Sequence, residues 1–324
     1  MITRKIIAAA FCAAAVLHAS FAGAQAWPTK PIRLMVPFPP GGSTDIVARI
    51  VAQKLAERLG QPIVIENRGG GGGTIGTAVV ARTAPDGYNL TVASTSTHVV
   101  APGVYPKLEY DPVRDFAPIG LMAVSPYLLV VNPAVPAKTL RELVALAKAQ
   151  PGKLNYASAG IGSTTHLAME MLKSASNTYV LHIPYSGNGP AGIAVVSGQV
   201  EILFGSLPAL LSQAKSGRVR ALAVGTPKRS PSLPDVPTVA ESGYPGFDAS
   251  LWLALMAPAG TPPAVIDRVN RELVALIAMP EMRAALDKAG AEPLTGTSAD
   301  LAAMIRDGVP KYAKIIKAAG ITAE

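Results

Sequence analysis

Short apolar or β-branched runs alternate along this chain with longer segments in which apolar residues recur at helical spacing. The runs predicted to be strands are residues 32–38, 62–67, 89–94, 127–132, 154–159, 181–185, 201–205, 219–225 and 251–257. The segments predicted to be helices are residues 44–59, 74–82, 139–149, 163–174, 189–197, 207–216, 262–278, 280–289 and 299–318. This alternation predicts an α/β protein with parallel or mixed sheets flanked by helices.

Two segments interrupt the alternation and divide the chain. Residues 111–124 carry closely spaced breakers, and two apolar runs then follow almost back to back, as if one strand left a sheet and entered another. Residues 227–246 hold five prolines and two glycines with little periodicity. A single sheet is the alternative, but we expect two crossovers between two lobes, the first formed by residues 27–122 and 250–324 and the second by 123–249.

Residues 1–26 have the pattern of a cleavable signal peptide. Arg4 and Lys5 precede an apolar stretch, and the small-x-small pattern that ends at Ala26 predicts cleavage there. The apolar stretch is too short to span a bilayer, so the mature chain is expected to be exported. Cys12, the only cysteine, lies in this segment, and the mature protein should therefore contain no disulfide and no thiol nucleophile.

Charge and composition exclude several classes of partner. The formal net charge is +8, and loss of Arg4 and Lys5 with the signal would leave +6. The basic residues are scattered along the chain, and aromatic residues make up only 5%. A nucleic-acid-binding protein would need a basic face with stacking rings, and a typical carbohydrate site would need ring walls, so neither ligand class is expected.

The first two predicted strands each run into a glycine-rich turn that leads to a helix. After the first come Gly41, Gly42, Ser43 and Thr44, and after the second comes a run of five glycines that begins at Gly69. Free amides at a helix start bind anions, and ligands of open α/β sheets bind at the carboxyl ends of strands. The alternatives are an ordinary capped turn and a flexible linker.

The second turn contains a GxGxxG pattern at Gly71, Gly73 and Gly76. This pattern is weak evidence for a dinucleotide site here, because it follows the second strand and no acidic residue stands about 20 positions later. We therefore predict no nucleotide cofactor. The amides at this helix start could still face the same crevice as those of the first turn.

Hydroxyl groups follow three other strands. Ser94 to Thr97 end the third strand, Ser163 to Thr165 follow a glycine turn, and Tyr185 precedes another glycine turn. Hydroxyls donate to a carboxylate without adding charge. His98 could be a pH-sensitive ligand group, but a structural role is the preferred interpretation.

Patterns of enzymes are weak in this sequence. His166 and Glu170 lie four apart, but HExxH and a third metal ligand are missing. Ser212 and Lys215 match SxxK without the supporting motifs, and GxSxG does not occur. We predict neither an enzyme nor a metal site.

Several passages together resemble the Bug family, the substrate-binding proteins of tripartite tricarboxylate transporters. They are Val36 to Asp45 (VPFPPGGSTD), Asn67-Arg68 with the glycine run, Ala84 to Tyr88 (APDGY), Tyr110 to Pro118 (YDPVRDFAP), His182 to Gly187 (HIPYSG), Leu233 to Thr238 (LPDVPT) and Ala257 to Pro262 (APAGTP). The likeness covers essentially all of residues 27–324. It implies a monomeric periplasmic protein with two hinged lobes, which captures a small carboxylated solute for membrane permease subunits and uses no cofactor.

The resemblance also implies the ligand contacts. Carried over by motif, they are Pro39, Gly41, Gly42, Ser43, Asp45, Ser94 and Thr97 in the first lobe, and Ser163, Thr164, His166, Tyr185 and Gly187 in the second. Family members commonly carry an aspartate near Ser206, where this chain has none. Amino-acid ligands are therefore less favoured than organic acids.

Two other functions remain open at this point. A sensor subunit that presents its ligand to a membrane kinase would use the same site with a different partner. An exported hydrolase would need Ser163 or Ser212 as a nucleophile. We expect capture of a carboxylate for transport.

Overall fold

The computed structural model describes residues 27–318 and 320–321, so the predicted signal peptide and its cleavage near Ala26 lie outside the described residues. The strands are β1 (Ile32–Val36), β2 (Ile63–Asn67), β3 (Asn89–Ser94), β4 (Phe116–Val131), β5 (Asn155–Ser158), β6 (Leu181–Pro184), β7 (Ile202–Ser206), β8 (Arg220–Val224), β9 (Ser250–Pro258) and β10 (Glu292–Pro293). They form one mixed sheet in the order β2-β1-β3-β9-β4-β7-β5-β6, and β8 and β10 also pair with β4.

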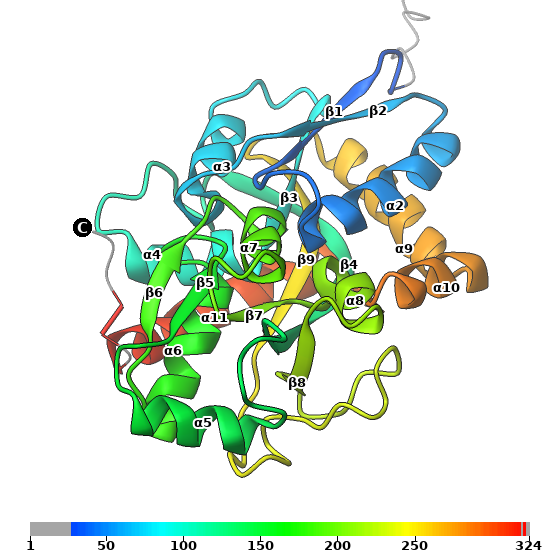
Figure 1. Ribbon diagram of the computed structural model, residues 1–324. Coiled ribbons are helices and arrows are strands. Elements are labelled where there is room, and N and C mark those ends of the chain that lie inside the picture. The colour runs from blue at the N-terminus through cyan, green and yellow to red at the C-terminus, as the bar shows by residue number, and fades with distance from the viewer. Residues whose placement is uncertain (1–26, 319, 322–324) are drawn as a thin grey trace, which may run out of the picture.

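Helices flank the sheet (Figure 1). They are α2 (Ser43–Leu59), α3 (Thr74–Ala81), α4 (Ala101–Val104), α5 (Leu140–Ala149), α6 (Thr164–Ser176), α7 (Asn188–Val196), α8 (Leu207–Lys215), α9 (Pro263–Ala278), α10 (Pro280–Lys288) and α11 (Ser298–Ala318), with short turns η1 (Gly71–Gly73) and η2 (Ser96–Val100). Within the described residues, none of the helices is long and apolar enough to cross a membrane.

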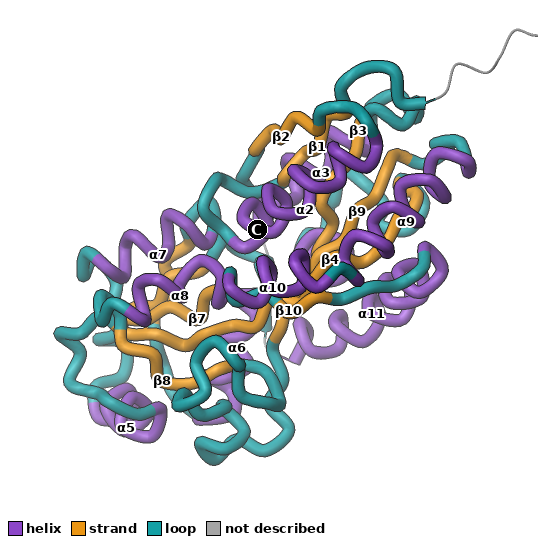
Figure 2. The backbone as a smooth tube through the Cα atoms, turned by 90° about the vertical axis from the view of Figure 1, so that its right-hand side faces the viewer, coloured by secondary structure: helices purple, strands orange, loops and turns teal. Residues whose placement is uncertain are grey.

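Two long strands join the two halves of the sheet. We call β1, β2, β3, β9 and the first part of β4 the first half, and β5 to β8 with the last part of β4 the second half. The antiparallel pair of β4 and β9 runs from Phe116 opposite Pro258 to Pro126 opposite Ser250. From Tyr127 onward, β4 pairs instead with β7. Figure 2 shows these two strands passing between the two groups of elements.

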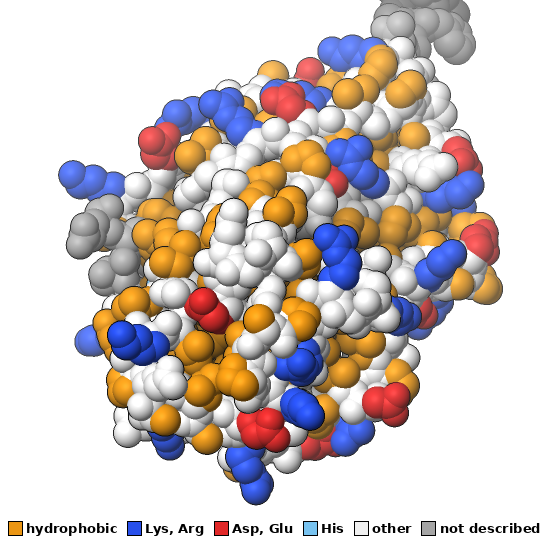
Figure 3. Space-filling view, in the orientation of Figure 1, with side chains coloured by type: hydrophobic (Ala, Val, Ile, Leu, Met, Phe, Trp, Pro, Cys, Tyr) orange, Lys and Arg blue, Asp and Glu red, His pale blue; other side chains and the backbone are white. Residues whose placement is uncertain are grey.

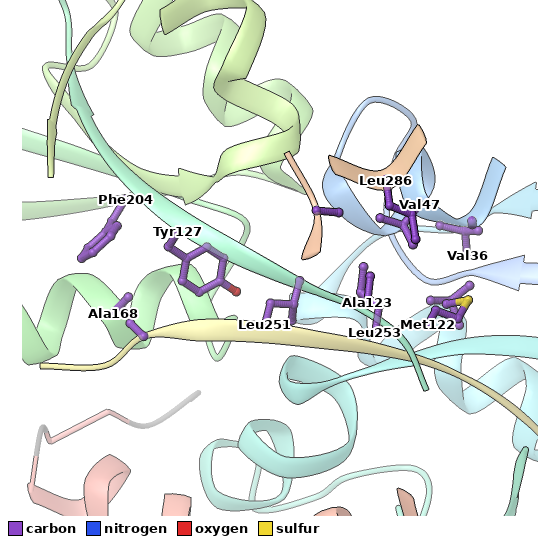
Figure 4. Close-up of a cluster of buried hydrophobic side chains, with 14 of the residues drawn as sticks. Val36, Val47, Met122, Ala123, Tyr127, Ala168, Phe204, Leu251, Leu253 and Leu286 are labelled. Carbon is purple, nitrogen blue, oxygen red and sulfur yellow. The ribbon is translucent and has the colours of Figure 1, made fainter. Parts of the chain in front are cut away.

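The hydrophobic core is continuous across both halves. One cluster contains Val36 and Val47 from the first half, Phe204 from the second, and Tyr127 and Leu253 from the joining strands. Figure 4 shows these side chains in a row along β4 and β9. Because the same strands carry core residues of both halves, each half packs against a shared layer.

The predicted α/β class is confirmed, and every predicted strand and helix has a counterpart in the structure. The two apolar runs after the first break are a single strand, β4, which belongs to both halves. The segment after β3 differs from expectation, because Ser96 to Val104 are helical. In Figure 3, basic and acidic side chains are scattered over the visible face without a dense basic patch.

Candidate functional site

The start of α2 presents free polar groups to the boundary between the two halves. Gly42 precedes the helix in an extended conformation, and no side chain caps this end. The hydroxyl of Ser43 is buried and has no hydrogen-bond partner among the described residues. Uncapped amides carry the positive end of the helix dipole, so this end suits an anionic group.

Asp45 holds the turn in place. Its carboxylate accepts hydrogen bonds from the amide of Gly41 at 3.0 Å, from Arg49 at 3.0 Å and from Asn67 at 2.9 Å. Burial acts to raise the pKa of this carboxyl group, but the hydrogen bonds from Arg49, Gly41 and Asn67 together outweigh it and lower the pKa. The Asp45 side chain is therefore charged and fully occupied within the first half.

Glycines allow the two halves to approach closely. A Cβ at Gly72, which has φ of +62°, would lie 2.8 Å from the carbonyl oxygen of Ile161 in the second half. A Cβ at Gly187 would lie 2.7 Å from Cδ of Pro39 in the first half. Larger residues at either position would hold the halves apart.

The start of α6 faces α2 across the same boundary. Ser163 caps the helix by accepting a hydrogen bond from the amide of His166 at 3.3 Å. The amide of Thr164 donates to the hydroxyl of Ser96 at 3.1 Å, and the two hydroxyls lie 2.9 Å apart. The Thr164 hydroxyl also hydrogen-bonds to that of Tyr127 on β4.

The start of α7 completes this side of the site. The helix begins at Asn188 after Gly187, without a side-chain cap. The Asn188 side chain accepts a hydrogen bond from the amide of Ser206 at 3.3 Å. The buried hydroxyl of Ser206 has no partner in the described part of the chain.

These elements enclose a small cavity of about 10 Å³, roughly the space that one water molecule needs. It is lined by neutral residues only, namely Phe38, Gly42, Ser43, Thr44, Ser96, Tyr127, Ala159, Ser163, Thr164, Thr165, Asn188 and Leu251. Any charge inside it must therefore be met by amide and hydroxyl donors. We call this space the inter-half cavity.

The structure brings four of the predicted site residues to this cavity: Gly42, Ser43, Ser163 and Thr164. Pro39, Gly41 and Gly187 lie in the turns beside it, and Asp45 supports one of those turns. Ser94 and Thr97 hydrogen-bond to each other behind the lining, with their hydroxyls 3.3 Å apart. His166 and Tyr185 do not line it either: His166 stacks on His182, and Tyr185 packs beside the second-half core.

Sequence reasoning missed several lining residues. Ser96 stands between the predicted Ser94 and Thr97, and Thr44 and Thr165 belong to turns that were singled out, so a local signal existed for these three. Tyr127 reads as an ordinary strand residue in sequence. Its contact with Thr164, 37 positions away, could not be read from local spacing.

The buried histidines are neutral. Burial lowers the pKa of His98 to about 3, and its ring lies against Phe116 at 4.9 Å between centroids. Burial, with a contribution from Lys173, lowers the pKa of His166 to about 4. Neither ring lines the inter-half cavity, so both have structural roles.

A larger hollow of about 220 Å³ lies between α6 and α11, with Asp248 and Lys311 among its lining residues. It shares Tyr127 and Thr164 with the inter-half cavity. We regard the smaller cavity as the candidate site because the uncapped helix starts meet there. Among the described residues, no group of three or more histidine, aspartate or glutamate side chains could hold a metal ion.

Comparison with known proteins identifies the family. The tripartite tricarboxylate transporter family receptor model matches residues 47–321. The chain belongs to this family. BugT of Bordetella pertussis, a relative of this receptor, is 38% identical over 298 residues, which cover 92% of this chain and 91% of BugT.

Solved structures of related proteins have the same fold. An R. palustris protein with adipate is 34% identical to this receptor, with a TM-score of 0.90 and coverage of 92% of this chain and 100% of that one. MatC from Rhodopseudomonas palustris with bound malate is 34% identical, with a TM-score of 0.85 and coverage of 90% and 100%. The receptor is therefore a solute-binding protein with the two-lobed fold of periplasmic binding proteins, and its family is not enzymatic.

Proposed function

We propose that this receptor captures a small organic acid between two lobes and delivers it to the permease subunits of a tripartite tricarboxylate-type transporter. The lobes are residues 27–122 with 250–324, and 123–249. The observation that carries the proposal is the buried, unpartnered Ser43 hydroxyl at the uncapped start of α2. The adipate and malate of the two related structures support the same ligand class.

Neutral donors are sufficient to hold a carboxylate here. Amides at a helix start form charge-assisted hydrogen bonds, which are shorter and stronger than bonds between neutral groups. The free hydroxyl of Ser43 adds a further donor beside these amides. An ammonium group would find no counter-charge among the lining residues, which favours organic acids over amino acids.

Closure of the lobes depends on contacts from both sides. A ligand favours the closed form only if it binds that form better than the open one. Ser43 and Thr44 belong to the first lobe, while Thr165 and Asn188 belong to the second. An acid that reaches both sets of donors stabilises the closed form, and β4 and β9 supply the hinge.

We place this capture in the periplasm, after removal of residues 1–26, with the receptor acting as a monomer. The neutral lining and the absence of a predicted cofactor fit a protein that binds and releases its solute unchanged. The partner is then a membrane permease that accepts the closed form.

A thermal-shift screen of organic acids followed by calorimetry tests the proposal. The wild-type protein should bind at least one small carboxylic acid, and Gly42→Leu should weaken that binding about 100-fold because the side chain enters the cavity. The extended backbone at Gly42 accepts any residue, so the variant should fold. Gln53→Leu, on the exposed face of the same helix, is the matched control. Binding of a sugar or a cation in place of an acid, or unchanged affinity of Gly42→Leu, would overturn the proposal.

A further inference from the structure

A direct side-chain contact joins the two halves at the inter-half cavity. The Ser96 hydroxyl, on η2 of the first half, accepts a hydrogen bond from the Thr164 amide at the start of α6 in the second half, at 3.1 Å. The Ser96 and Thr164 hydroxyls are 2.9 Å apart. Both side chains are almost fully buried, with exposed fractions of 2% and 5%.

The Thr164 amide is a group that an acid would also use. It is the first amide of α6, where the helix dipole favours negative charge, and Thr164 lines the cavity. A carboxylate oxygen and the Ser96 oxygen are both acceptors, so they compete for this N–H group.

Tyr127 fixes the other side of Thr164. Its hydroxyl hydrogen-bonds to that of Thr164, and burial raises its pKa, so the group stays protonated. Tyr127 lies on β4, where the strand passes from one half to the other. Ser96, Thr164 and Tyr127 thus form a chain of hydroxyls that links the first half, the second half and the joining strand.

We propose that Ser96 sets the affinity of the site by occupying the first amide of α6, so that a ligand carboxylate must displace it. The contact holds the halves together without a ligand. The binding free energy of a ligand is therefore only the difference between the free energy of its own hydrogen bonds and that of the Ser96 hydrogen bonds that it replaces. The competition for ligand rests on the proposed function, whereas the contact between the halves does not.

The first experiment measures the distance between the halves without ligand. Spin labels at Lys54→Cys on α2 and Lys148→Cys on α5, in a Cys12→Ser background, would be unique because Cys12 is the only cysteine. Both sites are exposed. Protein freed of bound solute by unfolding and refolding should show longer distances with Ser96→Ala than with wild type. Thr164→Val removes only the hydroxyl–hydroxyl contact and keeps the amide that donates to Ser96, so it should give a smaller shift in the same direction.

Ser125→Ala is the matched control. Ser125 is a fully buried serine on β4, and its hydroxyl has no hydrogen-bond partner among the described residues. Its distances should equal those of the wild type. If Ser96→Ala and Thr164→Val also keep the wild-type distances, the contact does not hold the halves together and the inference is wrong, whatever the ligand proves to be.

The second experiment measures affinity for adipate and malate by calorimetry. If Ser96 competes with the ligand, Ser96→Ala should bind roughly threefold to tenfold more tightly, which corresponds to the loss of one hydrogen bond. Weaker or unchanged binding would overturn the inference, because Ser96 would then contact the ligand or have no influence on it, while the proposed function would stand. If the wild type binds no organic acid in the screen, the proposed function fails and the distance measurement alone decides the role of Ser96.

Discussion

A buried hydroxyl without a hydrogen-bond partner has opposite effects on folding and on binding. The Ser43 hydroxyl is 1% exposed and unpartnered, so its burial costs free energy in the protein without ligand. Ser43→Ala should therefore be at least as stable as the wild type in urea, yet bind the acid about tenfold more weakly, because a hydrogen bond to a charged group is lost. Ser125→Ala should also be at least as stable as the wild type, but its affinity for the acid should be unchanged. Loss of stability with unchanged affinity would show that Ser43 serves the fold.

The site residues that could be predicted from the sequence are those whose local conformation is set by residues nearby in the chain. Gly42, Ser43, Ser163 and Thr164 lie in short turns between a strand and a helix, where glycine and hydroxyl groups have a direct physical meaning. Asp45 lies in the first turn of α2. Its role depends on Asn67, 22 positions away, so sequence spacing could not separate a ligand contact from a support of the turn.

The packing of α6 on β5 and β6 encloses titratable groups. His182 on β6 stacks on His166 of α6 at 4.1 Å and on Tyr156 of β5 at 4.7 Å between centroids, and Lys173 pairs with Glu170 nearby at 2.6 Å. The pKa of His182 is lowered to about 3, mainly by burial; His166 and Lys173 also lower it, and Glu170 raises it. The Nε2 atom lies 2.6 Å from the Ser158 hydroxyl.

A stability difference between neutral and acidic pH follows from this packing. Because the pKa of His182 is lower in the folded than in the unfolded protein, the unfolded state binds more protons as pH falls from about 6.5 towards 3. The free energy of unfolding should decrease over that range. Between pH 7 and pH 4.5, the free energy of unfolding of His182→Gln should decrease less than that of the wild type, as measured by urea unfolding at each pH. An equal loss in both proteins would show that other groups cause the acid sensitivity.

The elements themselves were predictable where periodicity is strong. Apolar runs between glycine or proline breakers matched the strands, and amphipathic segments matched the helices. Ser96 to Val104 were missed because the β-branched residues Thr97, Val99 and Val100 disfavour a helix in sequence. In the structure this segment is helical, and both of its parts, η2 and α4, pack against α11; such contacts outweigh propensity.

Across the whole molecule, the two predicted breaks have different structures. The first, residues 111–124, runs into β4, which continues without a turn from the first half into the second. The second is an irregular segment between β8 and β9, joined to the sheet by a bridge between Val224 and Thr238. The shared strands could not be predicted from the sequence, because the pairing of β4 with β9 joins residues more than 120 positions apart.

The shared core makes a prediction about unfolding of the whole protein. The chain has two tryptophans, and both lie in the first half: Trp27 beside Tyr88, and Trp252 on β9 opposite Val124. Tryptophan fluorescence therefore reports on the first half, while far-ultraviolet circular dichroism reports on all helices and strands. Because one hydrophobic cluster includes residues of both halves, the two signals should change at the same urea concentration. Separate midpoints would show that the halves unfold independently, and that β4 and β9 connect them without making them one cooperative unit.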